Sequence, residues 1–260
     1  MTASPEALAA ALTANRAFIH EALDAVLPKA EGPEARVSEA MRYAALGGGK
    51  RLRAFIAMET GKLFGVERSS MARVAAAIEC LHAYSLVHDD LPAMDNDGLR
   101  HGKPSTHRAF DEATAILAGD GLLTLAFGVL ASADTHADAH IRVELIARLA
   151  QAAGAHGMVG GQMIDMQAAE HELSLPEITR LQRLKTGALF EFSAEAGAIM
   201  GKAGREARHA LHGYTQELGL AFQIADDLLD VEGDAAAMGK AARKDANAGK
   251  ATFVTLMGID

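Results

Sequence analysis

Apolar residues recur every three or four positions along most of this chain, and no segment sustains an alternation of apolar and polar residues. The first spacing is typical of amphipathic helices, and the second would indicate strands. We therefore expect an all-α protein that forms one domain over residues 1–260. The expected helices cover residues 4–27, 37–46, 51–64, 69–91, 107–134, 138–157, 158–170, 175–202 and 204–232.

Three local signals predict where some of these helices begin and end. Ser4 followed by Pro5 is typical of a helix start, because serine caps free N–H groups and proline fits the first turn. The run Gly47–Gly49 ends the second helix, since glycine readily adopts the conformation of a C-terminal cap. Pro92 ends the fourth helix, because proline has no N–H to continue it.

The composition supports helices and limits the possible partners. Half of the 260 residues are hydrophobic, and the chain has no Trp and only six Pro. The net charge of −9 argues against nucleic acid or an anionic membrane as the main partner. Charges interrupt the long helices, so no membrane span is expected, and the N-terminus lacks the basic region of a signal peptide. A single cysteine, Cys80, fits the reducing cytoplasm.

Aspartates gather at the ends of two apolar helical stretches, in LVHDDLPAMDND at 86–97 and in FQIADDLLD. Like charges on one helix face repel, and carboxylates are costly to bury without a counter-ion. One such cluster is compatible with a solvated helix end, but two clusters of the same form favour a divalent cation. Carboxylates without nearby cysteine favour Mg²⁺, which substrate phosphates usually complete. The predicted ligands are Asp89, Asp90, Asp95, Asp226, Asp227 and Asp230.

A phosphorylated substrate would require positive partners, and two of the four basic segments lie directly after an acidic cluster. In GGGKRLR at 47–53, Lys50 and Arg53 are three positions apart and would share a helix face beside a glycine turn with free amides. Each cation alone is compatible with a solvated surface charge, but their placement favours a phosphate site. The other candidate cations are Arg100, His101, Lys103, Lys185, Lys240, Lys244 and Lys250.

Two Glu-x-x-His pairs leave a di-iron centre as an alternative. They are Glu79 with His82 and Glu206 with His209. The segment around the second pair is polar, and we find no convincing inward glutamates on two further helices. The di-iron interpretation is therefore much weaker than the Mg²⁺ interpretation.

Six segments, in this order, resemble the trans-isoprenyl diphosphate synthases, and are most similar to the bacterial farnesyl diphosphate synthases. They are GGGKRLR, LHAYSLVHDDLPAMDNDGLRHGKPSTH, GGQMIDM, LKTGALF, FQIADDLLD and GKATF. The resemblance extends over almost the whole chain. It implies an isoprenoid-synthase-type helical bundle around a central cavity, a homodimer, and about three Mg²⁺ ions at the substrate-bound site. The implied reaction condenses isopentenyl diphosphate with dimethylallyl or geranyl diphosphate to give farnesyl diphosphate.

The resemblance also assigns roles to matching positions. Both aspartate clusters would hold Mg²⁺ against the allylic diphosphate. Breaking the allylic C–O bond separates a carbocation from a diphosphate, so fixed cations would stabilise the leaving oxygens and an apolar cavity would exclude water. The implied substrate contacts are Arg100, Lys185 and Lys240 for the allylic diphosphate, Lys50, Arg53, His82 and the His101 position for isopentenyl diphosphate, Thr186 and Gln223 for the carbocation, and Lys250 in the GKATF segment.

Product length is expected to depend on the helix that precedes Asp89. Ser85 and Tyr84 lie four and five positions earlier, about one turn back along that helix. If the growing tail runs along the helix, Tyr84 would form a floor and stop growth at C15. The plainer interpretation is that Tyr84 is an ordinary core residue.

Three other functions remain open at this stage. A geranylgeranyl diphosphate synthase differs only in product length. A non-catalytic partner subunit should have lost one aspartate cluster, and a terpene cyclase would not need the Lys50, Arg53 and His82 set.

Two departures from the family pattern bear on activity. His101 stands where the family usually has a second arginine, and a neutral histidine binds phosphate less strongly. The chain ends at KATFVTLMGID, where relatives continue with further helices, so we expect the C-terminal helices of the family to be missing from it.

Overall fold

The computed structural model describes residues 4–168 and 173–232 and divides into two compact units. Unit 1 comprises Met1–Ile146 and Glu195–Ala203, and unit 2 comprises Ala147–Ala194 and Gly204–Asp260. The described residues are mostly helical, so the all-α prediction is confirmed. The single-domain prediction stays a prediction, and each unit is described by itself.

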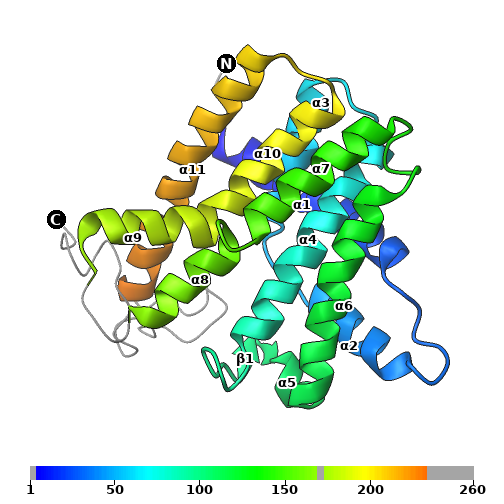
Figure 1. Ribbon diagram of the computed structural model, residues 1–260, viewed down its shortest axis with the longest axis vertical. Coiled ribbons are helices and arrows are strands. Elements are labelled where there is room, and N and C mark those ends of the chain that lie inside the picture. The colour runs from blue at the N-terminus through cyan, green and yellow to red at the C-terminus, as the bar shows by residue number, and fades with distance from the viewer. Residues whose placement is uncertain (1–3, 169–172, 233–260) are drawn as a thin grey trace. The chain divides into compact units, whose positions relative to one another are not determined.

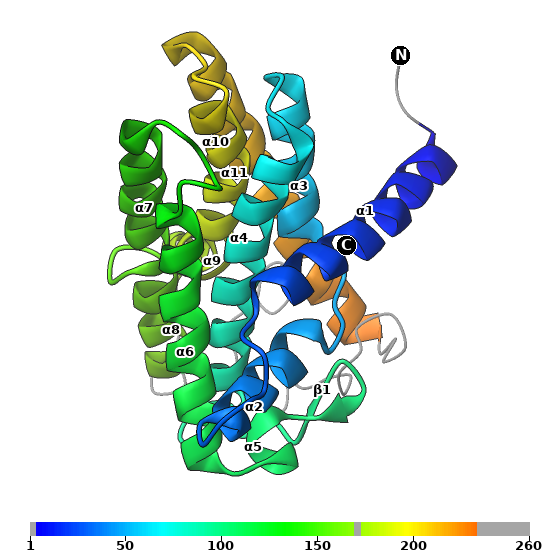
Figure 2. The ribbon, with the colours of Figure 1, turned by 90° about the vertical axis from the view of Figure 1, so that its right-hand side faces the viewer.

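Unit 1 is built around one buried helix, α4 (Arg68–Asp89), which packs against α1, α3 and α6. Every residue from 74 to 81 on α4 is buried, and Figures 1 and 2 both show α4 running beside α6. Small side chains allow this enclosure on several sides, because alanines occupy many of the contact positions. The other helices with residues in unit 1 are α1 (Pro5–Val26), α2 (Ala35–Leu46), α3 (Leu52–Leu63), α5 (Thr106–Ala109), α6 (Glu112–Ala131), the first half of α7 (Ala139–Ala153) and the end of α10 (Ala188–Met200).

Unit 2 packs its helices around a short π-helical turn, η1 (Arg183–Gly187). Gly161 allows α8 to approach this turn closely, because a Cβ there would lie 2.3 Å from the backbone nitrogen of Lys185. A small core of Ala168, Leu173, Ile178 and Leu181 lies in the same unit. The helices with residues in unit 2 are the end of α7, α8 (Met158–Gln167), α9 (Leu175–Gln182), most of α10 and α11 (Arg205–Glu232).

The predicted helix ends agree with the structure where a local signal specified them. The Ser4 side chain accepts a hydrogen bond from the Ala7 N–H at 3.2 Å, and Pro5 begins α1. Helix α4 ends at Asp89, three residues before Pro92. Between these signals, the boundaries shift by a few residues.

Two features differ from the sequence prediction. A short antiparallel hairpin pairs β1 (Leu99–Arg100) with β2 (Lys103–Pro104), and strands of two residues are too short to produce a period-two pattern. The helix expected over 175–202 is instead α9, η1 and α10 in succession. A π turn keeps the helical run continuous, so periodicity alone does not reveal it.

Helix α6 is also more apolar than expected. Among the described residues it is the one helix long and apolar enough to cross a membrane, with a mean hydropathy of 1.8 over its best window. The expectation that charges interrupt the long helices is therefore wrong for α6, but one such helix is weak evidence for a membrane span. A helix that packs in a core meets the same criteria, and α6 packs against α4 and α2 in unit 1.

Candidate functional site

The loop after α4 folds back onto the end of that helix. The Asp95 N–H donates to the Asp89 carbonyl at 2.8 Å, and the Asp97 N–H donates to the Asp90 carbonyl at 3.1 Å. Asn96, between them, has a φ of 51°, in the left-handed region that asparagine tolerates. The backbone of the first acidic cluster is therefore drawn together rather than extended.

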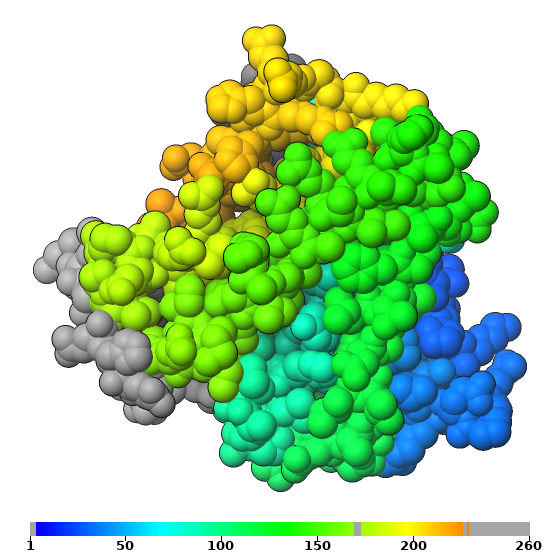
Figure 3. All heavy atoms as spheres, viewed as in Figure 1, coloured from blue at the N-terminus to red at the C-terminus, as the bar shows by residue number. Residues whose placement is uncertain are grey.

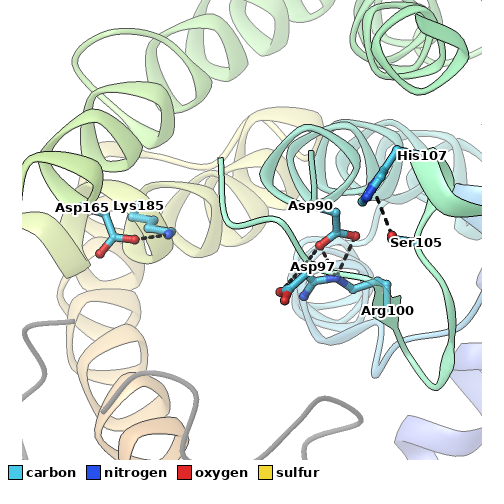
Figure 4. Close-up of polar contacts among 7 residues, drawn as sticks. All are labelled: Asp90, Asp97, Arg100, Ser105, His107, Asp165 and Lys185. Atoms are coloured by element: carbon cyan, nitrogen blue, oxygen red, sulfur yellow. Dashed lines mark hydrogen bonds and ion pairs between the residues drawn. The ribbon is translucent and has the colours of Figure 1, made fainter. Parts of the chain in front are cut away.

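Asp90 is held by Arg100 of the hairpin. Arg100 Nε donates to both Asp90 oxygens, at 3.0 and 3.2 Å, and its Nη2 also binds Oδ1 (Figure 4). The Asp90 residue is only 2% exposed, so it needs such a partner. Asp97 Oδ2 lies 3.5 Å from Arg100 Nη2. The hairpin thus delivers its arginine directly to the end of α4.

Arg100 sits in a negative environment. Burial lowers its pKa, but the hydrogen bond that Arg100 donates to Asp90 and the charges of Asp90, Asp89 and Asp95 outweigh burial, and the net shift is upward. Arg100 is therefore firmly charged, with carboxylates around it.

Asp89 and Asp95, like Asp90, remain predicted magnesium ligands. Mg²⁺ commonly uses one or two carboxylates and completes its shell with water and substrate phosphate. Within residues 4–168 and 173–232, no three carboxylate, imidazole or thiol side chains converge as a ready-made metal cage. Asp90 remains a predicted ligand, although its oxygens accept from Arg100 in this structure.

The glycine turn before α3 lies against the turn of the hairpin. A Cβ added at Gly48 would lie 3.4 Å from the His101 Cβ, and one at Gly49 would lie 3.4 Å from its Nε2. Gly48 and Gly49 have φ values of 140° and 103°, which glycine adopts without strain. His101 itself has a φ of 52°, and with Gly102 it forms the tight hairpin turn. Contact through His101 brings the two basic segments together.

Lys50 lies before helix α3 and does not share a helix face with Arg53. Helix α3 begins at Leu52, and Arg51 before it has a φ of 53°. The expectation that Lys50 and Arg53 share a helix face is therefore wrong, because the left-handed residue between them redirects the chain. Lys50 is exposed in the turn, whereas Arg53 is in the first turn of α3.

Arg51 is a buried residue that the sequence reasoning missed. Its Nη1 pairs with Glu79 Oε2 at 2.9 Å, and its Nη2 binds the Ala45 carbonyl. The other Glu79 oxygen accepts from the Ala54 N–H at 3.2 Å. Both carboxylate oxygens of Glu79 therefore bind groups at the start of α3. This arrangement argues against Glu79 as an iron ligand in the di-iron alternative. A glutamate within an apolar helix could have signalled a buried arginine partner.

Arg53 and His82 lie next to each other in a group of basic residues, the basic cluster. The cluster also contains Arg51, Arg100 and His101. Arg53 Nη1 lies 3.4 Å from His82 Nε2. The pKa of His82 lies well below its usual value, because of burial and then the charges of Arg53, Arg51, His101 and Arg100. Burial also lowers the Arg53 pKa, despite the charge of Glu79. Three arginines, Arg53, Arg51 and Arg100, act on His82, and their positive charges suit an anion.

His101 shares this potential. Burial lowers its pKa first, and the charges of Arg100 and Arg51 lower it further. Its imidazole is therefore neutral near pH 7 in the described structure. A bound phosphate would raise its pKa again.

Tyr84 and Ser85 lie on the last turns of α4, as predicted. The Tyr84 ring meets the His88 ring edge-on, with centroids 5.1 Å apart. Ser85 Oγ donates to the His82 carbonyl at 2.8 Å, within the helix. Burial raises the Tyr84 pKa, as do the charges of Asp89 and Asp120.

In unit 2, the π turn carries two of the predicted site residues. Lys185 Nζ pairs with Asp165 Oδ2 at 2.6 Å (Figure 4), and Thr186 Oγ1 donates to Gln223 Oε1 at 3.3 Å. π turns are frequent at functional sites because they insert a residue that re-aims side chains. Asp165 was not predicted as a site residue, although it lies in the GGQMIDM segment.

Part of the predicted site lies outside the described residues. Lys240 and Lys250 are beyond residue 232. Asp226, Asp227 and Asp230 belong to the backbone of α11, but their side chains are not described. The roles of these five residues stay predictions.

Comparison with known sequences gives one consistent match. The profile of the polyprenyl synthetase family matches residues 34–260. The farnesyl diphosphate synthase of Escherichia coli is 48% identical over 86% of this chain and 76% of its own length. The farnesyl diphosphate synthase of Geobacillus stearothermophilus is 43% identical over 95% of this chain and 84% of its own.

Comparison with solved structures agrees. A crystal structure described as an FPP/GFPP synthase from Zymomonas mobilis superposes with a TM-score of 0.85 and is 50% identical. The match covers 96% of this chain and 84% of that one. The sequence comparison and the structure comparison therefore find relatives of the same kind, the prenyl diphosphate synthases.

Proposed function

Because the chain belongs to the polyprenyl synthetase family, we propose that it is a Mg²⁺-dependent prenyltransferase that makes farnesyl diphosphate. It condenses isopentenyl diphosphate with geranyl or dimethylallyl diphosphate. The observation that carries this proposal is the meeting of three segments in unit 1. The acidic end of α4, the hairpin with Arg100 and the glycine turn before α3 are joined through Asp90 and His101.

The chain's own residues have distinct tasks in this proposal. Lys50, Arg53 and His82 bind isopentenyl diphosphate, with His101 beside them. Arg53 is partly buried against His82, near two other arginines, so it is oriented before the substrate arrives. Cations that are oriented in advance require little reorganisation when an anion binds.

In unit 1, the carboxylate-rich end of α4 is the proposed binding region for the allylic diphosphate, and the motif residues of unit 2 keep the roles that the family implies. Asp89 and Asp95 would hold Mg²⁺, as would the second cluster, and Arg100 and Lys185 bind the diphosphate. Mg²⁺, when bound, would neutralise the negative charge that develops on the diphosphate oxygens. Arg100 and Lys185 each have a carboxylate partner, Asp90 and Asp165, that orients the cation.

Carbon–carbon bond formation then needs no side-chain nucleophile. The allylic C–O bond breaks, and its electron pair leaves with the diphosphate. Thr186 and Gln223, which are hydrogen-bonded to each other, present oxygen dipoles to the carbocation. The alkene of isopentenyl diphosphate attacks, and the released diphosphate accepts the proton that is lost.

A homodimer and a cytoplasmic location belong to the same proposal. Helix α6 and the first half of α7 expose apolar side chains. The part of the chain that contains them, in green, lies on the face that Figure 3 shows. Ile116, Leu117 and Val143 are 45%, 58% and 64% exposed, which a second copy would cover. Cys80 is buried, and burial raises its pKa to about 12, so this thiol is unreactive and compatible with a reducing compartment.

The test is a product assay on the purified chain. It is incubated with isopentenyl diphosphate and geranyl diphosphate, with Mg²⁺ or with EDTA, and the prenyl products are sized by mass. We expect a C15 product with Mg²⁺ and none with EDTA. A C20 product would keep the prenyltransferase and reject the chain-length assignment, whereas no product under either condition would reject the proposed function.

A further inference from the structure

His88 is a partly buried side chain that the proposed reaction does not use. It lies on α4, one residue before Asp89, and faces α6. Its Nε2 is 3.1 Å from the Ile116 carbonyl oxygen and 4.0 Å from Asp120 Oδ1. A carbonyl oxygen only accepts, so this contact assigns the hydrogen to Nε2. The imidazole is thereby fixed to the neighbouring helix.

Gly119 on α6 provides the space for this ring. A Cβ there would lie 2.1 Å from His88 Nε2 and 2.4 Å from its Cδ2, which no real side chain permits. Glycine in the interior of a helix makes that helix less stable than alanine does. The close approach of the His88 ring is a packing reason for glycine at position 119. Gly128 on the same helix makes the contrast, because a Cβ there would meet nothing within 4 Å.

The imidazole in turn supports Tyr84. The two residues are four positions apart on α4, so their side chains share a face. Their rings meet at an interplanar angle of 79°, the edge-to-face arrangement that aromatic pairs favour. Asp120 of α6 lies close to both rings. Its Oδ1 is 4.0 Å from His88 Nε2, and its charge raises the pKa of Tyr84. Tyr84 is thus connected to α6 through His88.

We propose that His88 and Gly119 are positioning residues that set product length by holding Tyr84 in place. This inference rests on the proposed function and on Tyr84 as the floor of the tail site. A side chain that stops growth by steric contact must resist the push of each added isoprene unit. The ring of His88 supplies that resistance, and Gly119 lets the ring lie close enough to α6 to be anchored there.

The experiment compares four single variants with the unchanged chain in the same assay. These are Gly119→Ala, His88→Ala, Tyr84→Ala and the control Gly128→Ala. With excess isopentenyl diphosphate, the ratio of C20 to C15 product should rise about threefold to tenfold for Gly119→Ala and His88→Ala. Tyr84→Ala should raise it at least as much, and Gly128→Ala should leave it unchanged.

A double variant separates positioning from a general loss of structure. Because Gly119 acts through Tyr84, Gly119→Ala combined with Tyr84→Ala should give the ratio of Tyr84→Ala alone. A merely structural role would lower the thermal midpoint and the rate without changing the ratio. If Gly119→Ala does not fold, His88→Gln makes the same test, since its amide keeps a donor for the Ile116 carbonyl but removes the ring.

The outcomes distinguish this inference from the function on which it rests. An unchanged chain that makes no prenyl product overturns both. A C15 product from the unchanged chain, longer products from Tyr84→Ala and an unaltered ratio for both Gly119→Ala and His88→Ala overturn the positioning role alone. An equal shift in Gly128→Ala would also overturn it.

Discussion

Two arginine–carboxylate pairs of unit 1 look alike in chemistry and differ in what surrounds them. Arg51 and Glu79 have side chains 7% and 2% exposed, and their remaining hydrogen bonds go to backbone groups of the same unit. The Arg100 side chain is 23% exposed, whereas its partner Asp90 is as buried as Glu79, at 2%. Asp97 also lies near Arg100. The first pair is closed on itself and joins the start of α3 to α4. The second leaves its arginine partly accessible, as the proposed contact with a substrate anion requires.

Breaking the enclosed pair should give the largest loss of stability. Glu79→Gln would leave the buried Arg51 charge without its counter-ion, so the free energy of unfolding should fall by about 3–5 kcal/mol. Urea denaturation followed by circular dichroism measures this change. An unaltered midpoint would contradict the structural role of the Arg51–Glu79 pair.

Altering the accessible pair should affect activity more than stability. Arg100→Lys keeps the charge but loses the forked geometry, so kcat/KM for the allylic diphosphate should fall roughly 10²-fold. The free energy of unfolding should change by less than about 1.5 kcal/mol, because the ammonium still neutralises Asp90. Steady-state kinetics and urea denaturation on the same preparation check both numbers. Equal losses in the two measurements would contradict the comparison.

The basic cluster should make stability depend on pH. The pKa of His82 is lower in the folded chain than in the unfolded chain, so the unfolded state binds more protons below pH 6.5 or so. The free energy of unfolding should therefore fall as pH drops from about 7.5 to 5, by at most about 1.4 kcal/mol per pH unit for this group. His101 adds to the slope with the same sign.

A variant identifies the source of this slope. Replacing His82 with Gln should flatten the dependence in urea denaturation across this pH range, leaving the smaller part that belongs to His101. An equally steep slope in His82→Gln would show that other groups dominate.

A surface ion pair provides the lower end of the scale. Lys62 Nζ and Glu59 Oε2 lie 3.7 Å apart on α3, with side chains 79% and 49% exposed. Glu59→Gln should change the free energy of unfolding by less than about 0.5 kcal/mol, because water and salt screen the pair. A loss as large as that of Glu79→Gln would mean that burial is not what separates the pairs.

Periodicity and local signals predicted the parts of the fold that depend on neighbours in sequence. The Ser4 cap and the end of α4 before Pro92 are of this kind. The left-handed Arg51 and the hairpin turn at His101 were not predicted, because tertiary contacts hold these conformations. The π turn at Lys185 likewise depends on packing against α8, through Gly161.

The candidate site was predicted mainly through the resemblance of its motifs. The motifs identified Arg53, His82 and Arg100, and the structure shows which partners orient them. Arg51 and Asp165 were not predicted as site residues. Each one pairs with a single residue far away in the sequence, Glu79 and Lys185 respectively. Pairing of this kind requires residues far apart in sequence, so spacing alone does not reveal it.

The most direct test of the account is prenyl transfer by the unchanged chain and by Asp89→Asn, assayed together with isopentenyl and geranyl diphosphates. We expect Mg²⁺-dependent C15 product from the unchanged chain and a rate at least about 10²-fold lower for Asp89→Asn, with a similar thermal midpoint. Equal rates for the two chains, or no Mg²⁺-dependent product from the unchanged one, would contradict the assignment of the α4 end as the site of allylic diphosphate binding.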